Sequence, residues 1–371
     1  MYKALYMVNF RKGRRMKNFI KFIIFLAILL VTLSICTFIL NPAGSFNEWN
    51  ATNTIVDFYK QDKETIDVMY LGASGVYTGV SPFEIYQEDG ITGYSLSTPG
   101  QKIWSSYYLI KEALKTQKPK MIFLESGEIF NSAKNEQELN KRNVIDTMKF
   151  GKSKLEMIND EIYGFSNWQK LGCVFPILRY HGRWDKIDQN DARKLVCRGE
   201  NTYKGYLLES RIKKLAGRNK KIKSEKEELN ENFDEIKTSD VSEDAKKYIQ
   251  KILEICNQNE IKLVLLKIPE PTYWSVEKSA SVYKYAEEIH VQYIDLNYDE
   301  NINIDWDKDT QDEGNHLNIY GAEKVGKYIA TYLKNNCNLD DHRNDEKYQK
   351  WNDELENYKK QKEIVKENGH G

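Results

Sequence analysis

The sequence predicts an α/β protein with a mostly parallel sheet, helices on both faces of the sheet, and one transmembrane helix ahead of it. Short apolar runs typical of buried strands alternate with longer segments whose apolar residues recur at helical spacing. Ahead of this pattern, residues 22–40 carry no charge and follow a strongly basic segment. Alternation of strands and helices is typical of parallel sheets covered on both sides.

The uncharged segment 22–40 is close to the roughly 20 residues that a helix needs to cross the hydrocarbon core of a bilayer. The nearby basic residues all precede it: Lys3, Arg11, Lys12, Arg14, Arg15, Lys17 and Lys21. This asymmetry predicts a single-pass protein with residues 1–21 in the cytoplasm and everything after Leu40 outside. A cleaved signal peptide is the alternative, but residues 41–45 form a poor cleavage site and the apolar run is long for a signal core.

The chain has 371 residues, enough beyond the anchor for one large domain or two small ones. We expect a connecting segment at 41–65, an extracytoplasmic domain at 66–335 with an insertion at about 140–240, and a helical tail at 336–371. The tail carries an amphipathic pattern, with apolar positions at Tyr348, Trp351, Leu355 and Tyr358.

Charge and cysteine content exclude two classes of function. The net charge is zero, and the basic stretch 211–226 is interleaved with glutamates, so we expect no nucleic-acid partner. The 5 cysteines show no C-x-x-C spacing, so we expect no metal site and no cofactor. An isolated disulfide between Cys173 and Cys197 stays open as an alternative.

The elements of the domain follow in order. The expected strands are the apolar runs Val68–Leu71, Ile91–Leu96, Met121–Glu125, Ile261–Ile268 and Val291–Leu296. The expected helices have apolar residues at helical spacing and are Lys102–Lys115, Ser242–Asn257, Val282–Ile289 and Ala322–Leu333.

Ser74 lies two residues after Gly72, which permits a sharp turn at the end of the first strand. In open α/β sheets ligands bind outside the carboxyl ends of the strands, so Ser74 is a candidate nucleophile. Taken alone, this position is also typical of a serine that only caps a helix.

A second signal lies in the segment Asp312-Glu313-Gly314-Asn315-His316, which is followed by a helix-capping asparagine. A carboxylate that binds one nitrogen of an imidazole leaves the other nitrogen free to take a proton from a hydroxyl. Asp312 is the favoured acid because the turn at Gly314 can absorb an extra residue, and Glu313 is the alternative.

Leu71-Gly72-Ala73-Ser74 and Asp312 to His316 with Leu317-Asn318 resemble the nucleophile and Asp/His blocks of the SGNH (GDSL-like) hydrolase superfamily. The membrane-anchored bacterial branch that includes the D-alanyl-lipoteichoic-acid transfer protein and the alginate O-acetylation proteins is the most similar in character. The resemblance implies a three-layer, flavodoxin-like fold and a catalytic triad of Ser74, His316 and Asp312. It also implies a location at the bacterial cell membrane.

The resemblance implies an oxyanion hole from the backbone N–H groups of Ser74 and Gly100. The superfamily's oxyanion asparagine has no counterpart, since Ser126-Gly127 stands in its place. Either Ser126 or Gln101 substitutes for it, or turnover is slow. Further candidates for lining the substrate site are His181 and Arg183, in an aromatic-rich insertion predicted to roof the site, and Lys267 and Trp274 near the end of a strand. For His181 and Trp274, surface or packing roles are the alternative.

These residues predict a serine esterase or acyltransferase. The expected location outside the membrane and the resemblance together imply that it acts on O-acyl groups of a cell-envelope polysaccharide or teichoic-acid-like polymer. The resemblance adds a membrane-bound O-acyltransferase as a partner. The alternative function is a catalytically weak or inactive module of the same fold that binds glycan or that partner.

Overall fold

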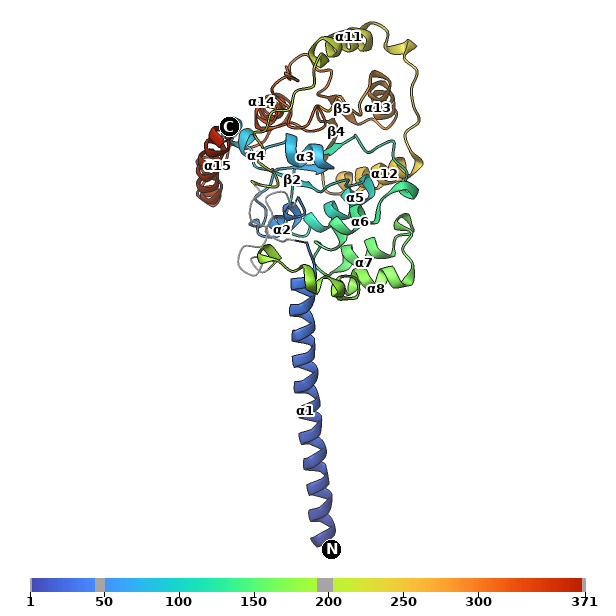
Figure 1. Cartoon of the computed structure of the whole chain (residues 1–371), viewed down its shortest axis with the longest axis vertical. Coiled ribbons are helices and arrows are strands. Elements are labelled where there is room, and N and C mark those ends of the chain that lie inside the picture. The colour runs from blue at the N-terminus through green and yellow to red at the C-terminus, as the bar shows by residue number, and fades with distance from the viewer. Residues whose placement is uncertain (1, 44–50, 192–202, 369–371) are drawn as a thin grey trace.

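The computed structural model describes residues 2–43, 51–191 and 203–368 (Figure 1). Its centre is a parallel sheet of five strands in the order β2-β1-β3-β4-β5. The strands are β1 (Val68–Gly72), β2 (Gly93–Ser97), β3 (Met121–Glu125), β4 (Lys262–Lys267) and β5 (Gln292–Asp295). The predicted parallel α/β architecture is therefore confirmed. The strand order is that of flavodoxin-like sheets and reverses between β1 and β3.

Successive strand residues point to opposite faces of the sheet, and both faces are buried. Met69 and Leu71 belong to one apolar core, whereas Val68 and Tyr70 belong to a second core on the other face. The first face is covered by α5 (Ile103–Ala113), α12 (Glu243–Gln258) and α13 (Val276–Glu288). The second is covered by α3 (Ser74–Gly79), α4 (Pro82–Asp89) and α14 (Ile319–Asn336). Burial on both sides explains why the strands read as continuous apolar runs.

Side-chain caps set where several helices begin. The hydroxyl of Ser242 accepts the N–H of Ala245 at the start of α12. The side chain of Asn318 accepts the N–H groups of Tyr320 and Gly321, as predicted for the closing helix. Helix α13 begins six residues earlier than the sequence pattern predicted, because Ser275 caps it by accepting the N–H of Lys278.

The predicted insertion contributes short helices at the end of the domain where the chain enters from α1 (Figure 1). They are α6 (Glu138–Ile145), α7 (Lys152–Asn159), α8 (Asn167–Val174), α9 (Ile177–Tyr180) and the 3-10 helix η3 (His181–Lys186). Helix α11 (Arg218–Glu231) lies at the opposite end of the domain. Cys197 lies outside the described residues, so the alternative disulfide remains a hypothesis. Cys173 is buried and receives a hydrogen bond from Arg142.

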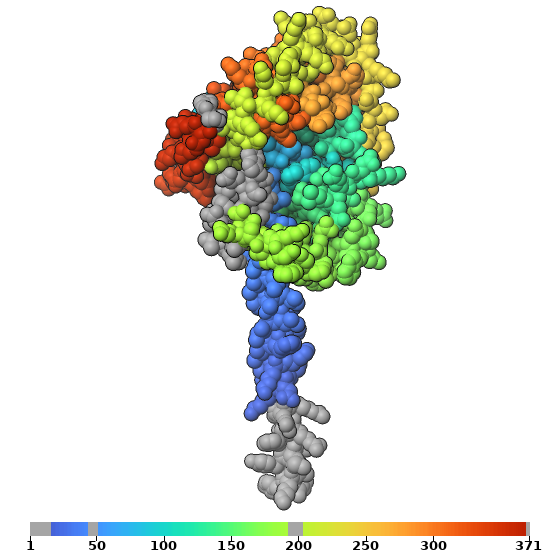
Figure 2. Space-filling view, in the orientation of Figure 1, coloured from blue at the N-terminus to red at the C-terminus, as the bar shows by residue number. Residues whose placement is uncertain are grey.

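Helix α1 (Tyr2–Leu40) projects from the domain as a single rod (Figures 1 and 2). Its part Met16–Leu40 spans 25 residues, is long and apolar enough to cross a membrane, and is almost entirely exposed. The helix begins well before residue 22, where the sequence pattern placed it. Lysine and arginine are good helix formers, so the basic segment continues the helix.

The C-terminal tail forms α15 (Gln349–Asn368), which packs on α4 as the predicted amphipathic helix. Its buried residues Trp351, Leu355 and Tyr358 join Phe83 and Tyr86 in a third apolar cluster. The Tyr358 hydroxyl also donates to Glu84 at 2.6 Å. The tail is therefore part of the folded domain.

Glu136 gives the fold a specific pH dependence. Burial raises the pKa of its carboxyl from 4.5 to about 7, although it accepts a hydrogen bond from the Trp104 indole. Because the folded state binds this proton more tightly, the group's contribution to stability is complete below pH 4.5 and is lost as the pH rises to about 7. As the pH rises from 4.5 to about 7, we expect the free energy of unfolding of Glu136→Gln to increase by about 3 kcal/mol relative to that of the native chain. Urea unfolding at several pH values measures the difference, and equal pH slopes for the two chains would contradict it.

Candidate active site

Ser74 lies at the carboxyl end of β1, beside the reversal in strand order where flavodoxin-like sheets bind ligands. Gly72 is required here, because a Cβ atom at that position would lie 2.4 Å from the Cβ of Glu125 on β3. Ala73 is extended and α3 begins at Ser74. The N–H of Ser74 therefore belongs to the first turn of a helix, where backbone donors have no intrahelical acceptor.

A tight turn presents His316. Glu313 and Gly314 both adopt left-handed backbone conformations, with φ of 61° and 91°. Their curvature accommodates the four-residue spacing between Asp312 and His316. The Thr310 hydroxyl closes the turn, since it accepts the N–H of Gly314 at 2.7 Å and donates to the carbonyl of His316 at 3.0 Å.

Ser74, His316 and Asp312 form a continuous hydrogen-bonded chain, as the sequence predicted. The distance from His316 Nε2 to Ser74 Oγ is 2.7 Å, and that from His316 Nδ1 to Asp312 Oδ2 is 2.6 Å. Asp312 Oδ1 also accepts the backbone N–H of His316 at 2.7 Å. Partial burial raises the pKa of the Asp312 carboxyl, but the hydrogen bonds from His316 outweigh this effect and hold that pKa below its usual value.

Glu313, the alternative acid, points elsewhere. Its side chain is 58% exposed and pairs with Lys213 at 3.3 Å, and its N–H donates to the Lys213 carbonyl. The geometry therefore favours Asp312 as the partner of His316.

Tyr77 adjoins the same site and was missed in the sequence. Its phenol lies close to Ser74 and Asp312, and burial raises the pKa of this phenol to about 12. The phenol therefore stays protonated at neutral pH. The signal was available, since residues three apart on a helix that begins at Ser74 share one face.

Gly100 adopts a left-handed conformation with φ of 63°, and a Cβ atom there would lie 2.3 Å from the Asn140 amide. Gly100 is thus fixed in a tight turn after β2, at the same sheet edge as Ser74. Gln101, predicted as a substrate-lining residue, is buried. Its amide donates to the Leu96 carbonyl and the Ser106 hydroxyl, so it holds the turn instead of facing a substrate.

Ser126 is likewise buried, and its N–H donates to the Leu266 carbonyl at 2.9 Å. Its hydroxyl donates to the same carbonyl at 3.4 Å. These contacts tie the end of β3 to β4 and turn Ser126 away from the role of substrate donor.

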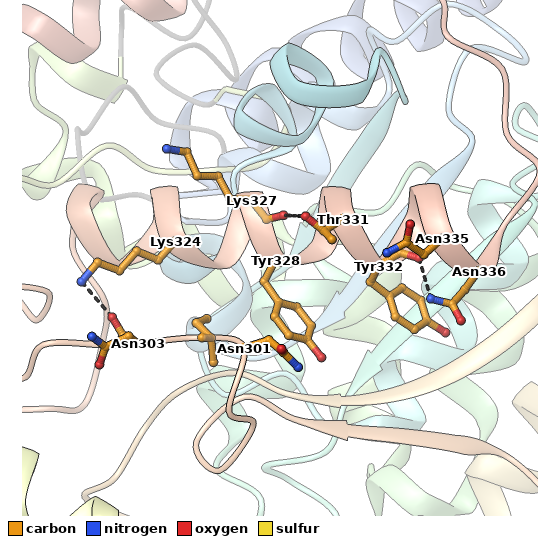
Figure 3. Close-up of a pocket in the computed structure, with 10 residues that line it drawn as sticks. Asn301, Asn303, Lys324, Lys327, Tyr328, Thr331, Tyr332, Asn335 and Asn336 are labelled. Atoms are coloured by element: carbon orange, nitrogen blue, oxygen red, sulfur yellow. Dashed lines mark hydrogen bonds between the residues drawn. The ribbon is translucent and has the colours of Figure 1, made fainter.

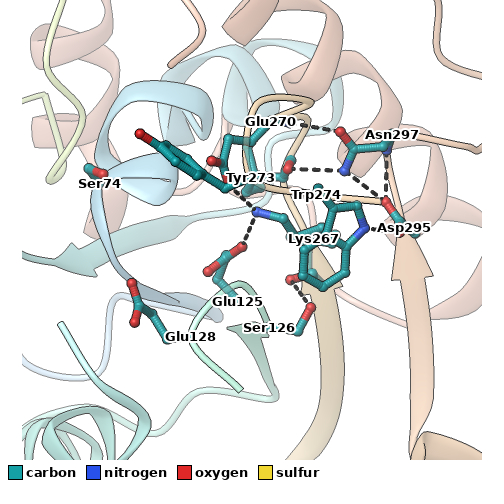
Figure 4. Close-up of polar contacts among 12 residues, drawn as sticks. Ser74, Glu125, Ser126, Glu128, Lys267, Glu270, Tyr273, Trp274, Asp295 and Asn297 are labelled. Carbon is teal, nitrogen blue, oxygen red and sulfur yellow. Dashed lines mark hydrogen bonds and ion pairs between the residues drawn. The ribbon is translucent and has the colours of Figure 1, made fainter. Parts of the chain in front are cut away.

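Lys267 lies in a buried charged network at the carboxyl ends of the strands, at the same edge as Ser74 (Figure 4). Its ammonium contacts Glu125 Oε1 and Glu270 Oε2, both at 2.9 Å. Burial lowers the pKa of Lys267, but the two carboxylates outweigh this and hold it above its usual value. Trp274, predicted to line the substrate site, is instead buried and donates its indole N–H to Asp295 at 2.7 Å. The network supports the edge of the sheet and neither side chain faces solvent.

We expect Lys267→Met to lower the free energy of unfolding by about 3–5 kcal/mol, because it leaves Glu125 charged, buried and unpaired. Glu125→Gln in the same chain should restore part of the loss. Urea unfolding measures both, with Lys152→Met as the control, since Lys152 is 85% exposed. A Lys267→Met chain as stable as this control would contradict the interpretation.

His181 and Arg183 do not roof the site, contrary to the prediction. Arg183 donates to the carbonyl of Leu40 at 2.5 Å and pairs with Asp191 at 3.1 Å. His181 is exposed, with Nδ1 3.1 Å from the carbonyl of Leu178. Contacts with the end of α1 hold this part of the insertion at the end of the domain where α1 enters. Helix α11 lies at the opposite end (Figure 1).

A separate groove of about 590 Å³ runs along α14 (Figure 3). Lysine, asparagine and tyrosine side chains line it, including Lys324, Tyr328 and Tyr332. It contains none of the predicted site residues. Among the described residues, no group of three or more His, Cys, Asp or Glu side chains is arranged to hold a metal ion.

No protein-family model matches the chain, and no curated protein sequence matches it. The inference of function therefore rests on the chemistry of the site.

Proposed function

We propose that the protein is a membrane-anchored serine esterase or acyltransferase with Ser74 as nucleophile, His316 as general base and Asp312 as the acid that orients the imidazole. The observation that carries the proposal is the unbroken chain of hydrogen bonds from Ser74 Oγ through both ring nitrogens of His316 to Asp312. Three side chains from two distant parts of the sequence meet in the geometry that acyl transfer requires.

In the first half of the reaction, Ser74 Oγ attacks the carbonyl carbon of an ester or thioester while its proton passes to His316 Nε2. Asp312 stabilises the imidazolium. The oxygen of the tetrahedral intermediate accepts hydrogen bonds from the N–H groups of Ser74 and Gly100. Collapse of the intermediate expels the alcohol or thiol, which takes the proton from His316 and leaves the acyl group on Ser74.

In the second half, His316 removes a proton from the acceptor, which attacks the acyl-serine. Water as acceptor gives an esterase, and a sugar or polyol hydroxyl gives an acyltransferase. Proton transfer back to Ser74 Oγ then restores the starting state.

Helix α1 supports a location at the membrane, since Met16–Leu40 is long and apolar enough to span it. The basic residues on its N-terminal side favour a cytoplasmic N-terminus and a domain outside the bacterial cell membrane. The substrate class we propose is an O-acylated cell-envelope polysaccharide or teichoic-acid-like polymer. A membrane-bound O-acyltransferase is the proposed donor of acyl groups.

Mass analysis of ester substituents on the envelope polymer tests this function. Cells that carry the native chain should differ in ester content from otherwise identical cells that carry Ser74→Ala. Equal ester content, with both chains present in the membrane at equal amounts, would contradict the proposal.

One observation favours a second candidate, a glycan-binding or partner-binding module without turnover. The residue after β3, where the resembled superfamily supplies an oxyanion donor, is Ser126, and its N–H and hydroxyl both donate to the Leu266 carbonyl within the sheet. Losing one such donor typically costs about two to three orders of magnitude in rate. Under this alternative, Ser74→Ala leaves polymer binding and ester content unchanged.

A further inference from the structure

Exposed apolar side chains gather on one part of the domain. Outside α1, eight of the eleven large apolar side chains that are exposed among the described residues fall in residues 139–187. Trp168, Phe175 and Trp184 are 67%, 55% and 74% exposed. Large exposed apolar clusters of this kind mark interaction sites. We call helices α8, α9 and η3, residues 167–186, the base of the domain.

The base is attached to the last turn of α1. The Arg183 guanidinium donates to the Leu40 carbonyl at 2.5 Å. Outside the base, the amide of Asn41, which directly follows α1, donates to the Asp146 carbonyl at the end of α6 at 3.3 Å. Both α9 and η3 contact α1. The space-filling view shows the base flanking the point where α1 meets the domain (Figure 2). The height of the base along α1 is therefore fixed.

A groove of about 440 Å³ lies between the base and α1. One wall contains Val174, Phe175, Pro176 and Ile177, and the other includes Leu30, Leu33 and Phe38. Leu30 precedes Leu40 by ten residues, or about 15 Å of helix. The groove therefore descends well below the point where α1 ends.

This depth places the base at the membrane. A hydrocarbon core of about 30 Å takes roughly 20 helical residues, so with Lys21 at one surface, Leu30 lies near the middle of the core and Leu33 to Phe38 lie in the far leaflet. Phe175 and Ile177 line the groove beside them and share that depth. Tryptophan side chains such as Trp168 and Trp184 favour the boundary between acyl chains and headgroups.

We propose that the base is seated in the outer leaflet of the membrane that holds α1, and that a phospholipid acyl chain occupies the groove beside Phe175. The proposal rests on the proposed role of α1 as a membrane anchor. Two attachments, α1 and the base, then fix how the sheet edge that carries Ser74 is oriented relative to the membrane.

Quenching of tryptophan fluorescence by brominated phosphatidylcholine tests this seating. The full chain carries Trp49→Phe throughout, because Trp49 lies outside the described residues, and is reconstituted into vesicles with bromine on the acyl chains near the headgroup. Trp104, Trp274, Trp306 and Trp351 are buried in the domain and are shielded from lipid. We expect brominated lipid to reduce the emission, and Trp168→Phe with Trp184→Phe to abolish most of that reduction.

Two matched controls sharpen the experiment. Lys223→Trp, added to the chain that lacks Trp168 and Trp184, puts an exposed tryptophan on α11 at the far end of the domain, and its emission should be insensitive to bromine. In the chain that keeps Trp168 and Trp184, Phe175→Asp should reduce the quenching of these two tryptophans. Ile364→Asp on α15, also at an exposed apolar position, should not reduce it.

The outcomes separate this inference from the anchor on which it rests. A chain that resists alkaline extraction from vesicles but shows equal emission in brominated and ordinary lipid keeps its anchor and overturns the seating of the base. In that case the exposed apolar side chains of the base would contact another membrane protein instead of lipid. A chain that alkaline extraction releases overturns the anchor and the seating together.

Discussion

Replacing Ser74 with alanine should lower kcat for ester hydrolysis by about 10⁶-fold, the size of loss seen when a triad serine or histidine is removed. His316→Ala should cost about as much. Since the two side chains act as one unit, with Nε2 and Oγ 2.7 Å apart, the double variant should be no slower than either single variant. Hydrolysis of an activated acetyl ester by the full-length protein measures all three rates.

Thermal unfolding is the control for these variants, because both positions are only partly buried and the fold should survive. Losses that add in the double variant would show that Ser74 and His316 act independently. Such a result would be incompatible with a triad.

Asp312→Asn should lower kcat by about 10⁴-fold, since the amide no longer holds the imidazole in its productive tautomer or stabilises its charged form. Glu313→Gln is the matched control one residue away. It removes only an exposed ion pair with Lys213 and should leave kcat within about twofold of the native value. Comparable losses in the two variants would contradict the assignment of Asp312 as the orienting acid.

The sequence was sufficient for the framework of the fold. Each strand is buried on both faces, so its apolar run was readable without knowledge of its neighbours. The site's central pair was also predictable, because Ser74 follows a strand directly and His316 precedes a helix cap. Both positions are determined by local sequence.

Positions that depend on distant contacts were not predictable. The turn at Gly314 was enough to favour Asp312 over Glu313, but the contact that holds Glu313 away from His316 comes from Lys213, in a segment whose path the sequence pattern left open. Gln101 looked available at the sheet edge, yet its amide turns inward to Leu96 and Ser106. Nothing in the insertion's own sequence indicated that Arg183 would bond to Leu40 at the end of α1.

The ion pairs of Lys267 could not be predicted from the sequence for a similar reason. Lys267 at the end of a strand was a reasonable candidate for substrate contact, because charged residues at that edge often face ligands. Its two partners, Glu125 and Glu270, lie on β3 and just beyond β4. Glu270 is near Lys267 in the sequence, but only the parallel pairing of β3 and β4 brings Glu125 to the same ammonium.

Covalent labelling by a fluorophosphonate tests the central claim most directly, that His316 activates Ser74 as a nucleophile. Attack by Ser74 Oγ on phosphorus displaces fluoride, and the mass of the intact chain rises by one phosphonyl group. We predict a single modification that peptide mapping assigns to Ser74 and that is absent in Ser74→Ala and His316→Ala. Folded native protein that remains unmodified, or that is modified at another residue, would contradict the account.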